Sequence, residues 1–404
     1  MLWDVFCRVV DNFGDIGVCW RLATGLAGRG EQVRLWVDDA RALAWMAPQL
    51  KWMPATTEAP ARALGQPGVT VLHTADTTFA GPLPCPAEPG AHHALCGDVV
   101  VETFGCDPPD AFLHRMQARA QAGQAAQWLN LEYLSAEDYV ERSHRLRSPV
   151  WSGPGAGLHK HFFYPGFTSA TGGLLRDPAQ FSAHESASRD GSARASLLAR
   201  LGISAEARDL VVLVFCYPDA PVKALLDHLD EMGKMGARAS QAVHVLLAPG
   251  AATAAGQAWD LNGTHPTVKL HALPYLPQTT FDELLWCTDL NFVRGEDSAT
   301  QALWSPAPHV WHIYPQDDGV HADKLDAFMA RWMGAWPPEL SRHVQDLWRA
   351  WNGLALQAEA QAGTLPPLPD CRGAWRESHH QSRQALLAQA DLVTQLLDFV
   401  TAAG

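Results

Sequence analysis

The sequence predicts an α/β protein whose two halves form separate domains. Its 404 residues exceed what one hydrophobic core usually organises, which favours two domains. Both halves alternate short apolar runs with amphipathic segments, the pattern of parallel sheets flanked by helices. Glycine-containing polar loops follow several apolar runs, and ligands bind at such loops in open parallel sheets.

The N-terminal half begins with an apolar run, a tight polar loop and an amphipathic run, which predicts strand, loop and helix. The acidic residues Asp38 and Asp39 end the second strand, as in dinucleotide-binding folds. The first loop lacks the glycines of that motif, so we reject NAD as a cofactor. The elements expected here are strands at 2–10, 32–37, 69–73, 98–101 and 127–131, and helices at 18–27, 109–121 and 136–145.

The C-terminal half shows five strand-like runs that alternate with helices, which predicts a parallel sheet. Right-handed crossovers then place every strand-exit loop at one edge of that sheet. We therefore expect Tyr217, Tyr275, Gln278 and the loops 294–298 and 316–318 to lie together. The expected elements are strands at 210–215, 242–247, 268–273, 290–293 and 309–313, and helices at 221–232, 280–287, 299–304 and 319–332.

The predicted domains are 1–175 and 199–377. The polar, Ser/Ala-rich segment 176–198 is the predicted linker. A final amphipathic helix at 378–400 could pack back on the first domain. The aromatic stretch 151–171 fits no regular element, and we expect it to pack in the interior rather than to form a site.

Composition excludes several classes of function. The net charge of −13 argues against nucleic-acid binding and against adsorption to an anionic membrane. No uninterrupted apolar run reaches the length needed to span a bilayer. The eight cysteines form no C-x-x-C pair, which favours a reduced, cytoplasmic setting. We expect no metal site, because the adjacent acidic and histidine pairs are typical of solvated turns.

Two loops are candidates for chemistry. In the first, Asp11 and Asp15 flank Gly14 at a strand exit, so both carboxylates are offered to a cleft, although Asp15 could instead cap the following helix. The second, 294–298, opens a helix whose free N–H groups, together with Arg294 and Ser298, would cradle phosphate. Helix capping by Asp297 or Ser298 is the alternative interpretation.

The second loop also predicts a ligand. Glu296 and Asp297 would repel a bare phosphate, so we expect them to bind hydroxyl groups of a sugar. Aromatic side chains in neighbouring exit loops would stack on a base, and base, sugar and phosphates together describe a nucleotide sugar. These aromatic residues are Phe215, Tyr217, Tyr275 and Phe281.

Four motifs in this order resemble the protein-arginine rhamnosyltransferases of translation elongation factor P, the EarP family. They are VVDNFGDIG at 9–17, FCYP at 215–218, NFVRGEDS at 291–298 and VWHIYPQ at 310–316. The resemblance spans nearly the whole chain. It implies GT-B architecture, in which two Rossmann-like, doubly wound domains face a central cleft, with domain 1–175 binding the acceptor and domain 199–377 binding the nucleotide sugar. The implied donor is dTDP-β-L-rhamnose and the implied acceptor is elongation factor P. Inversion at the anomeric carbon is implied as well, with neither metal nor cofactor.

The resemblance also implies roles for individual residues. Asp15 corresponds to the proposed general base, Asp11 to its companion carboxylate, and Glu296 to a second essential carboxylate. The implied substrate-binding residues are Asn12, Phe13, Gly14, Phe215, Tyr217, Tyr275, Gln278, Phe281, Arg294, Gly295, Asp297 and Ser298. We expect the carboxylates of Asp15 and Glu296 to face each other across the central cleft.

The acceptor raises a question of charge, because elongation factor P is generally acidic, as is this chain. Complementarity must then be local, and Arg142, Arg145 and Arg147 form a candidate patch, for which a solvated helix end is the alternative. Two other functions stay open from the residues alone. They are a GT-B enzyme that acts on a small molecule or glycan, and a non-catalytic nucleotide-binding module.

Overall fold

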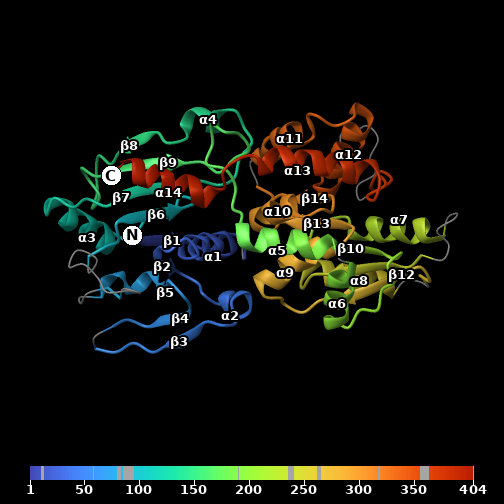
Figure 1. Cartoon of the computed structure of the whole chain (residues 1–404), viewed down its shortest axis with the longest axis horizontal. Coiled ribbons are helices and arrows are strands. Elements are labelled where there is room, and N and C mark those ends of the chain that lie inside the picture. The colour runs from blue at the N-terminus through green and yellow to red at the C-terminus, as the bar shows by residue number, and fades with distance from the viewer. Residues whose placement is uncertain are drawn as a thin grey trace. The chain divides into compact units, whose positions relative to one another are not determined.

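The computed structural model describes residues 1–10, 13–57, 59–79, 83–84, 95–189, 191–234, 241–261, 265–316, 319–354 and 364–403. The chain forms two compact units (Figure 1). Unit 1 consists of Met1–Arg176 and Gln389–Gly404, and unit 2 consists of Asp177–Ala388. Each unit is an α/β domain with its own largely or wholly parallel sheet, which confirms the predicted fold class.

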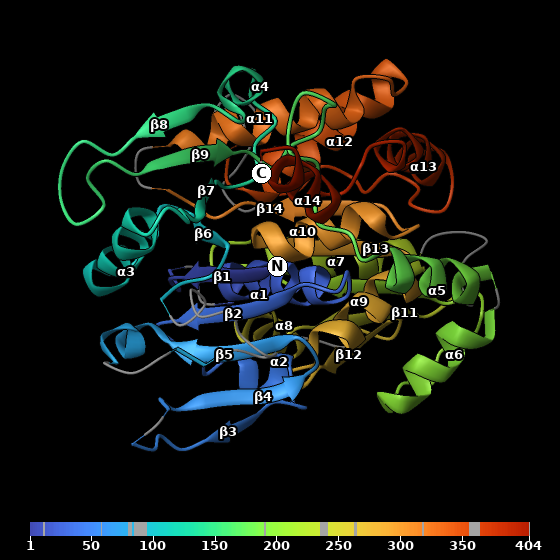
Figure 2. The same cartoon turned by 60° about the vertical axis from the view of Figure 1, so that its left-hand side comes forward.

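Unit 1 is built on a sheet of order β3-β4-β5-β2-β1-β6-β7-β9-β8, which runs from bottom to top in Figure 2. The central strands β5, β2, β1, β6, β7 and β9 pair in parallel, whereas β3, β4 and β8 pair antiparallel. The strands are β1 (Leu2–Cys7), β2 (Gln32–Val37), β3 (Lys51–Met53), β4 (Arg62–Gln66), β5 (Val69–His73), β6 (Val99–Thr103), β7 (Gln127–Leu131), β8 (Arg147–Pro149) and β9 (His159–Phe163).

Helices cover both faces of this sheet. On one face α1 (Gly14–Ala27) and α14 (Leu392–Ala403) pack against the strands, and on the other face α3 (Asp110–Gln121) packs against Phe6 and Val100. Because both faces are covered, all six residues of β1 are buried. The shorter helices are α2 (Leu43–Met46), η1 (Thr74–Thr78) and α4 (Tyr139–Ser143).

A buried ion pair fixes the centre of unit 1. Asp4 of β1 accepts hydrogen bonds from Arg34 Nε at 2.6 Å and Arg34 Nη2 at 2.7 Å, and neither side chain is exposed. The same carboxylate accepts from Trp36 Nε1 at 2.8 Å and from the Gly97 backbone N–H at 2.5 Å. These bonds tie β1 to β2 and to the segment before β6, so the buried charge is fully partnered.

Unit 2 contains a sheet of order β12-β11-β10-β13-β14, in which every pair is parallel. Its strands are β10 (Leu210–Val214), β11 (Val243–Leu247), β12 (Val268–Ala272), β13 (Leu290–Arg294) and β14 (His309–His312). Its helices are α5 (Pro178–Arg189), α6 (Gly191–Arg200), α7 (Val222–Lys234), α8 (Ala251–Asp260), α9 (Gln278–Cys287), α10 (Gly295–Trp304), α11 (Val320–Met333), α12 (Pro338–Trp351) and α13 (Ala374–Leu387).

The segment predicted as a linker, 176–198, forms α5 and α6 of unit 2 instead. Its Ser/Ala composition suits a helix, because alanine is a strong helix former and Ser182 bonds its hydroxyl to the Pro178 carbonyl four residues earlier. Phe181 packs on Trp286 at 5.5 Å, and Leu197 is buried. These apolar contacts, which composition alone does not reveal, hold the segment against the rest of unit 2.

The single helix predicted at 378–400 is two helices, α13 in unit 2 and α14 in unit 1, with a break at 388–391. Asp391 begins α14 by accepting the Thr394 N–H at 3.1 Å, and it also pairs with Arg29. By length and hydropathy 374–402 qualifies as the one membrane-span candidate among the described residues. The break, and the burial of Trp375 and Leu396, show that its halves pack in two cores.

The aromatic stretch 151–171 contains β9, a strand that the sequence analysis missed. Phe163 and Phe167 are buried, as predicted, but Trp151 is 87% exposed. The first strand and helix also differ in length from the prediction, because β1 ends at Cys7 and α1 already begins at Gly14.

Two histidines lie inside unit 2 beside Trp332: His309 of β14 and His379 of α13. Burial lowers the pKa of His379 to about 3 and that of His309 well below its ordinary value. Histidine in an unfolded chain titrates near pH 6.5. As the pH falls below about 6.5, the unfolded chain therefore binds more protons than the folded chain, and stability decreases.

We expect the free energy of unfolding of unit 2 to fall by up to about 1.4 kcal/mol per pH unit for each of these histidines below pH ~6.5. His379→Gln, which keeps a donor for the Ser305 carbonyl, should reduce this slope. Urea unfolding between pH 7 and 4 measures it. His380→Gln, at an exposed position of the same helix, is the matched control; equal slopes in both variants would contradict the assignment.

Candidate functional site

In unit 1 the polar candidates lie where parallel strands end. β1 has β2 on one side and β6 on the other. The chain thus adds strands on one side of β1 first and on its other side from β6 onward. Such a switch point is where open α/β sheets bind ligands. The loop after β1 leads to Asp15, the residue after β6 is Phe104, and the segment after β7 contains Tyr133.

Asp15 lies in the first turn of α1 with only 3% of its surface exposed. Its Oδ2 accepts the Val10 backbone N–H at 2.8 Å, and its Oδ1 accepts the Tyr133 hydroxyl at 3.4 Å. Phe13 is the N-cap residue, so Asp15 does not occupy the capping position of the alternative interpretation. The carboxylate is thus oriented by its own loop and by a tyrosine 118 residues away in sequence.

The ring of Tyr133 stacks on Phe104, with centroids 4.4 Å apart and planes 11° apart. Phe104 has a φ of 56°, a left-handed conformation that costs a non-glycine residue about 1–3 kcal/mol. Its N–H donates to the Leu131 carbonyl at 2.8 Å. The backbone at the end of β6 is therefore held in a strained form that presents an aromatic ring to Tyr133.

The other residues predicted in this loop have mixed outcomes. Asp11 and Asn12 lie outside the described residues. Phe13 packs edge-to-face on Trp45 at 5.1 Å, and Gly14 is the first residue of α1. Both directly precede Asp15 in the sequence, and the structure shows Phe13 in a packing role against Trp45.

One buried and one half-buried carboxyl group lie near this edge. Glu102 of β6 pairs with Lys160 of β9 at 2.5 Å, and burial raises its pKa to about 7. Burial also raises the pKa of Glu132, whose Oε1 accepts from Asn130 Nδ2 at 2.9 Å. Glu102 can therefore keep a proton near neutral pH.

In unit 2 the switch point lies between β10 and β13. Arg294, the last residue of β13, reaches the exit loop of β10, where its Nη1 donates to the Cys216 carbonyl at 3.1 Å. Its guanidinium carbon lies 4.5 Å from the ring centroid of Phe215 and 4.8 Å from that of Tyr217. Cation–π contacts and one hydrogen bond thus fix the direction of this cation.

The loop predicted at 294–298 is the start of α10 itself, because the helix begins at Gly295 rather than at 299. Gly295 has a φ of 68°, which allows the strand to turn directly into the helix. The Ser298 hydroxyl donates to the Arg294 carbonyl, and Gln278 Nε2 donates to Asp297 Oδ2 at 3.0 Å. Neither Asp297 nor Ser298 is the N-cap residue, which is Arg294.

Glu296 forms an ion pair with Lys324 of α11, with Oε1 and Nζ 2.5 Å apart. Both side chains are less than a fifth exposed, at 18% and 17%. The sequence analysis missed Lys324, which lies on a helix after the next strand. The pair places one positive charge beside the acidic start of α10.

Aromatic groups surround Arg294. Phe281 packs edge-to-face on Phe215 at 5.7 Å, and Tyr314 packs on Tyr217 at 5.6 Å. The Tyr217 N–H donates to His312 Nδ1 at 3.3 Å, which leaves Nε2–H of His312 for Asp219 at 3.5 Å. That contact lowers the pKa of Asp219.

The exit loops of unit 2 thus lie at one edge as predicted, although 317–318 fall outside the described residues. Tyr275, also in an exit loop, is 53% exposed. All six tyrosines of the chain follow a strand of a parallel pair: Tyr133, Tyr139, Tyr164, Tyr217, Tyr275 and Tyr314. This distribution is a signal in the sequence that would have found Tyr133.

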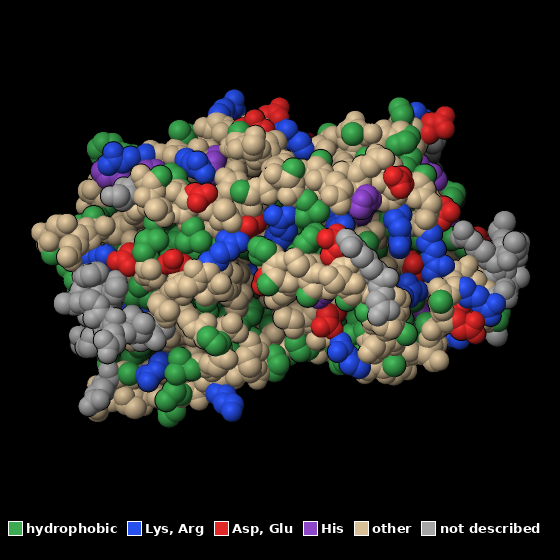
Figure 3. Space-filling model, in the orientation of Figure 1, with side chains coloured by type: hydrophobic (Ala, Val, Ile, Leu, Met, Phe, Trp, Pro, Cys, Tyr) green, Lys and Arg blue, Asp and Glu red, His purple; other side chains and the backbone are tan. Residues whose placement is uncertain are grey.

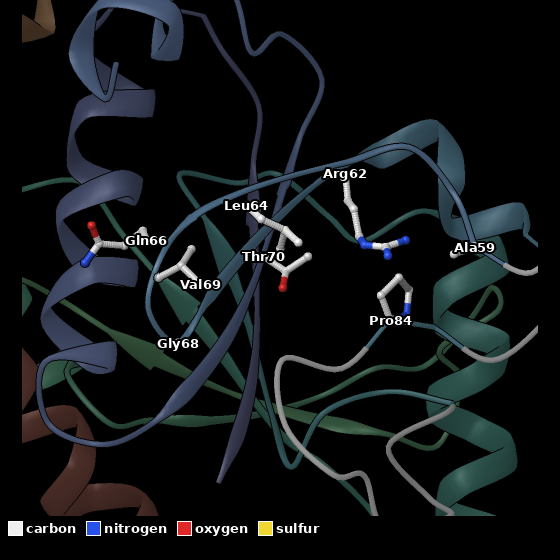
Figure 4. A pocket seen from close by; sticks show the side chains of 8 residues that line it. All are labelled: Ala59, Arg62, Leu64, Gln66, Gly68, Val69, Thr70 and Pro84. Atoms are coloured by element: carbon white, nitrogen blue, oxygen red, sulfur yellow. The ribbon is translucent and has the colours of Figure 1, made fainter. Parts of the chain in front are cut away.

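Other potential sites are less informative. In the described part of the chain, no three His, Cys, Asp or Glu side chains are grouped to hold a metal ion. A cavity of about 440 Å³ lies against β4 and β5, and Figure 4 shows Arg62 extending over it beside Pro84. It contains none of the residues predicted from the sequence.

A model of the family described as Elongation-Factor P (EF-P) rhamnosyltransferase EarP matches residues 3–401. The chain belongs to the EarP family. It is 38% identical to a protein-arginine rhamnosyltransferase of Pseudomonas putida and 33% identical to one of Pseudomonas aeruginosa, each over 98% of both chains. A structure reported as the basis for EarP-mediated arginine glycosylation of EF-P covers 100% of this chain and 99% of its own, at 26% identity and a TM-score of 0.60.

Membership of the EarP family makes the chain a glycosyltransferase, and each of its two units is an α/β domain. This agrees with the resemblance and the fold class expected from the sequence.

The conformation of Gly295 can be tested. Gly295→Ala should lower the free energy of unfolding by about 1–2 kcal/mol, because alanine is strained at a φ of 68°. Gly353 has the same φ and open space around it, so Gly353→Ala should lower the free energy of unfolding by a similar amount. Urea unfolding measures the stability of both variants. An unchanged free energy of unfolding in Gly295→Ala would contradict the direct strand-to-helix turn.

Proposed function

We propose that this protein transfers L-rhamnose from dTDP-β-L-rhamnose to an arginine side chain of translation elongation factor P and thereby activates that factor. The transfer inverts the anomeric carbon and uses neither a metal ion nor a cofactor. The family match over residues 3–401 carries the proposal. The arrangement of charged and aromatic groups at the two sheet edges supports it.

On the donor side, unit 2 offers what a nucleotide sugar requires. Arg294 and the N–H groups that open α10 would bind the diphosphate, since helix N-termini attract anions. The rings of Phe215, Tyr217, Tyr275 and Phe281 would hold the base, with Gln278 beside them. Glu296, held by Lys324, and Asp297 would accept hydrogen bonds from sugar hydroxyls.

On the acceptor side, a guanidinium is a poor nucleophile because it stays protonated and its lone pair is delocalised. Asp15 would bind the cation and take a proton from the attacking nitrogen as the carbon–nitrogen bond forms. The Tyr133 hydroxyl and the Val10 N–H keep its carboxylate in one orientation. Asp11, in the same loop, is the proposed companion.

In the displacement, the nitrogen attacks the anomeric carbon while the bond from that carbon to the diphosphate oxygen breaks. The electron pair leaves with dTDP, and Arg294 and the α10 N-terminus stabilise the growing charge. One such step inverts the configuration, which is why we favour it over a covalent intermediate. Positive charge from the protein takes the place that a divalent ion has in other transferases.

We propose a cytoplasmic setting. Seven cysteines lie among the described residues, and all of them are free. Free, buried thiols suit a reducing compartment.

Incubation of the protein with dTDP-β-L-rhamnose and elongation factor P tests the proposal. We expect the acceptor to gain the mass of one deoxyhexose on an arginine. Transfer to a small molecule or glycan instead, or binding of dTDP without turnover of the donor, would each contradict it.

Asp15→Asn should keep dTDP binding and reduce transfer by at least about 100-fold, because the amide cannot take the proton. Mass spectrometry measures transfer, calorimetry measures dTDP binding, and circular dichroism checks the fold. Wild-type turnover in this variant would remove Asp15 as the base.

Arg294→Ala should weaken dTDP binding by about 10-fold or more, since a bidentate charged contact is lost. Arg342→Ala, at an exposed position of α12 in the same unit, is the control and should bind normally. An unchanged calorimetric affinity of Arg294→Ala would contradict the phosphate cradle.

A further inference from the structure

One part of unit 1 is basic in an otherwise acidic chain. The chain has 43 Asp and Glu against 30 Lys and Arg, yet residues 142–176 contain no Asp or Glu. This segment forms the end of α4, the antiparallel pair β8 and β9, and their connecting loop. Lys, Arg and His side chains gather over β8 and β9 in Figure 3. Its Lys and Arg residues are Arg142, Arg145, Arg147, Lys160 and Arg176.

The arginines of this segment have different roles. Arg145 has a φ of 65°, its N–H donates to the Phe162 carbonyl at 2.7 Å, and its guanidinium lies over Phe163 and Phe399. It therefore fixes the turn between α4 and β8. Arg142 and Arg147 are exposed, and neither forms an ion pair with any described residue. Within the described part of the chain, these two surface cations are thus left without a carboxylate partner.

Exposed apolar side chains accompany these cations. Trp151, in the loop between β8 and β9, is 87% exposed, and Leu146 is 54% exposed. An exposed tryptophan in the same hairpin as arginines that pair with no described carboxylate has the composition of a protein-binding surface, because Trp and Arg carry much of the energy of interfaces. The edge strand β8 consists of only three residues and ends in Pro149, which disfavours addition of a partner's strand. Binding would then use side chains.

Part of this surface adjoins the acceptor edge. Arg145 and Leu146 pair with Phe162 near the end of β9, whereas Trp151 and His159 lie at the start of β9, where the parallel strands begin. β7 leads into Tyr133, which bonds to Asp15, and six residues later Tyr139 begins α4. Tyr139 packs edge-to-face on Tyr164, which follows β9 directly. The chain thus runs from the proposed base to the basic segment within one unit.

We propose that Arg142, Leu146, Arg147, Trp151 and the exposed His159, together called the hairpin surface, dock the acceptor protein. The occupant is a folded protein that presents carboxylates next to its target arginine, so that the guanidinium reaches Asp15 while its acidic neighbours meet Arg142 and Arg147. This inference rests on the proposed function. An acidic chain that modifies a protein gains orientation and a faster encounter from such a local patch.

The other end of the same sheet offers a matched control. β3, the outermost strand there, carries an exposed lysine followed by an exposed tryptophan, Lys51 and Trp52, the latter 48% exposed. The test variant is Arg147→Glu/Trp151→Ala, and the control is Lys51→Glu/Trp52→Ala. Both change one charge by two units and remove one indole from unit 1.

Calorimetry with elongation factor P in the absence of donor measures docking directly. The hairpin variant should bind at least about 10-fold more weakly, and its KM for the acceptor should rise similarly, with kcat and dTDP affinity retained. The control should match the wild type. Raising the salt concentration should weaken wild-type binding more than binding by the hairpin variant.

Equal acceptor affinity of the hairpin variant and the wild type would overturn the proposal, as would a loss confined to the β3 control. Fluorescence polarisation with tRNA tests the rival occupant; RNA binding that the hairpin variant loses, with acceptor binding unchanged, would also overturn it. Docking without any rhamnosyl transfer by the wild type would support the surface and refute the proposed function.

Discussion

Parallel pairing of strands is the constraint on which both units depend. A parallel strand must be followed by a crossover on one face of the sheet, so all strand exits collect at one edge. In unit 1 this brings the exits of β1, β6 and β7 together, and in unit 2 those of β10, β13 and β14. Reactive groups far apart in the sequence thereby become neighbours.

At both edges the charged groups are held by aromatic rings as well as by hydrogen bonds. Tyr133 is positioned by Phe104, and Arg294 by Phe215 and Tyr217. A ring restricts the direction in which the neighbouring polar side chain points. It leaves the outer hydrogen-bonding positions of that side chain available to a ligand. We consider this the reason that rigid orientation and substrate binding coexist here.

The sequence predicted where the main strands lie along the chain and the strand-exit position of Asp15 and Arg294, because both follow from local hydrophobic pattern. It did not reveal Tyr133 or Lys324, whose partners lie 118 and 28 residues away and depend on which strands are neighbours. The helices α5 and α6 were missed because a Ser/Ala-rich segment is equally typical of a linker and of a helix; the packing of Phe181 on Trp286 decides between them. β9 was missed because its aromatic residues alternate poorly with polar ones.

The path of the chain has a consequence for biosynthesis. Unit 2 is inserted between the body of unit 1 and its last helix, α14, whose Leu392, Val393, Leu396 and Val400 belong to the core beneath α1. A ribosome releases all of unit 2 before it supplies those side chains. The apolar side of α1 that α14 covers therefore stays exposed to solvent while unit 2 is synthesised. The first unit to begin folding is the last to be completed.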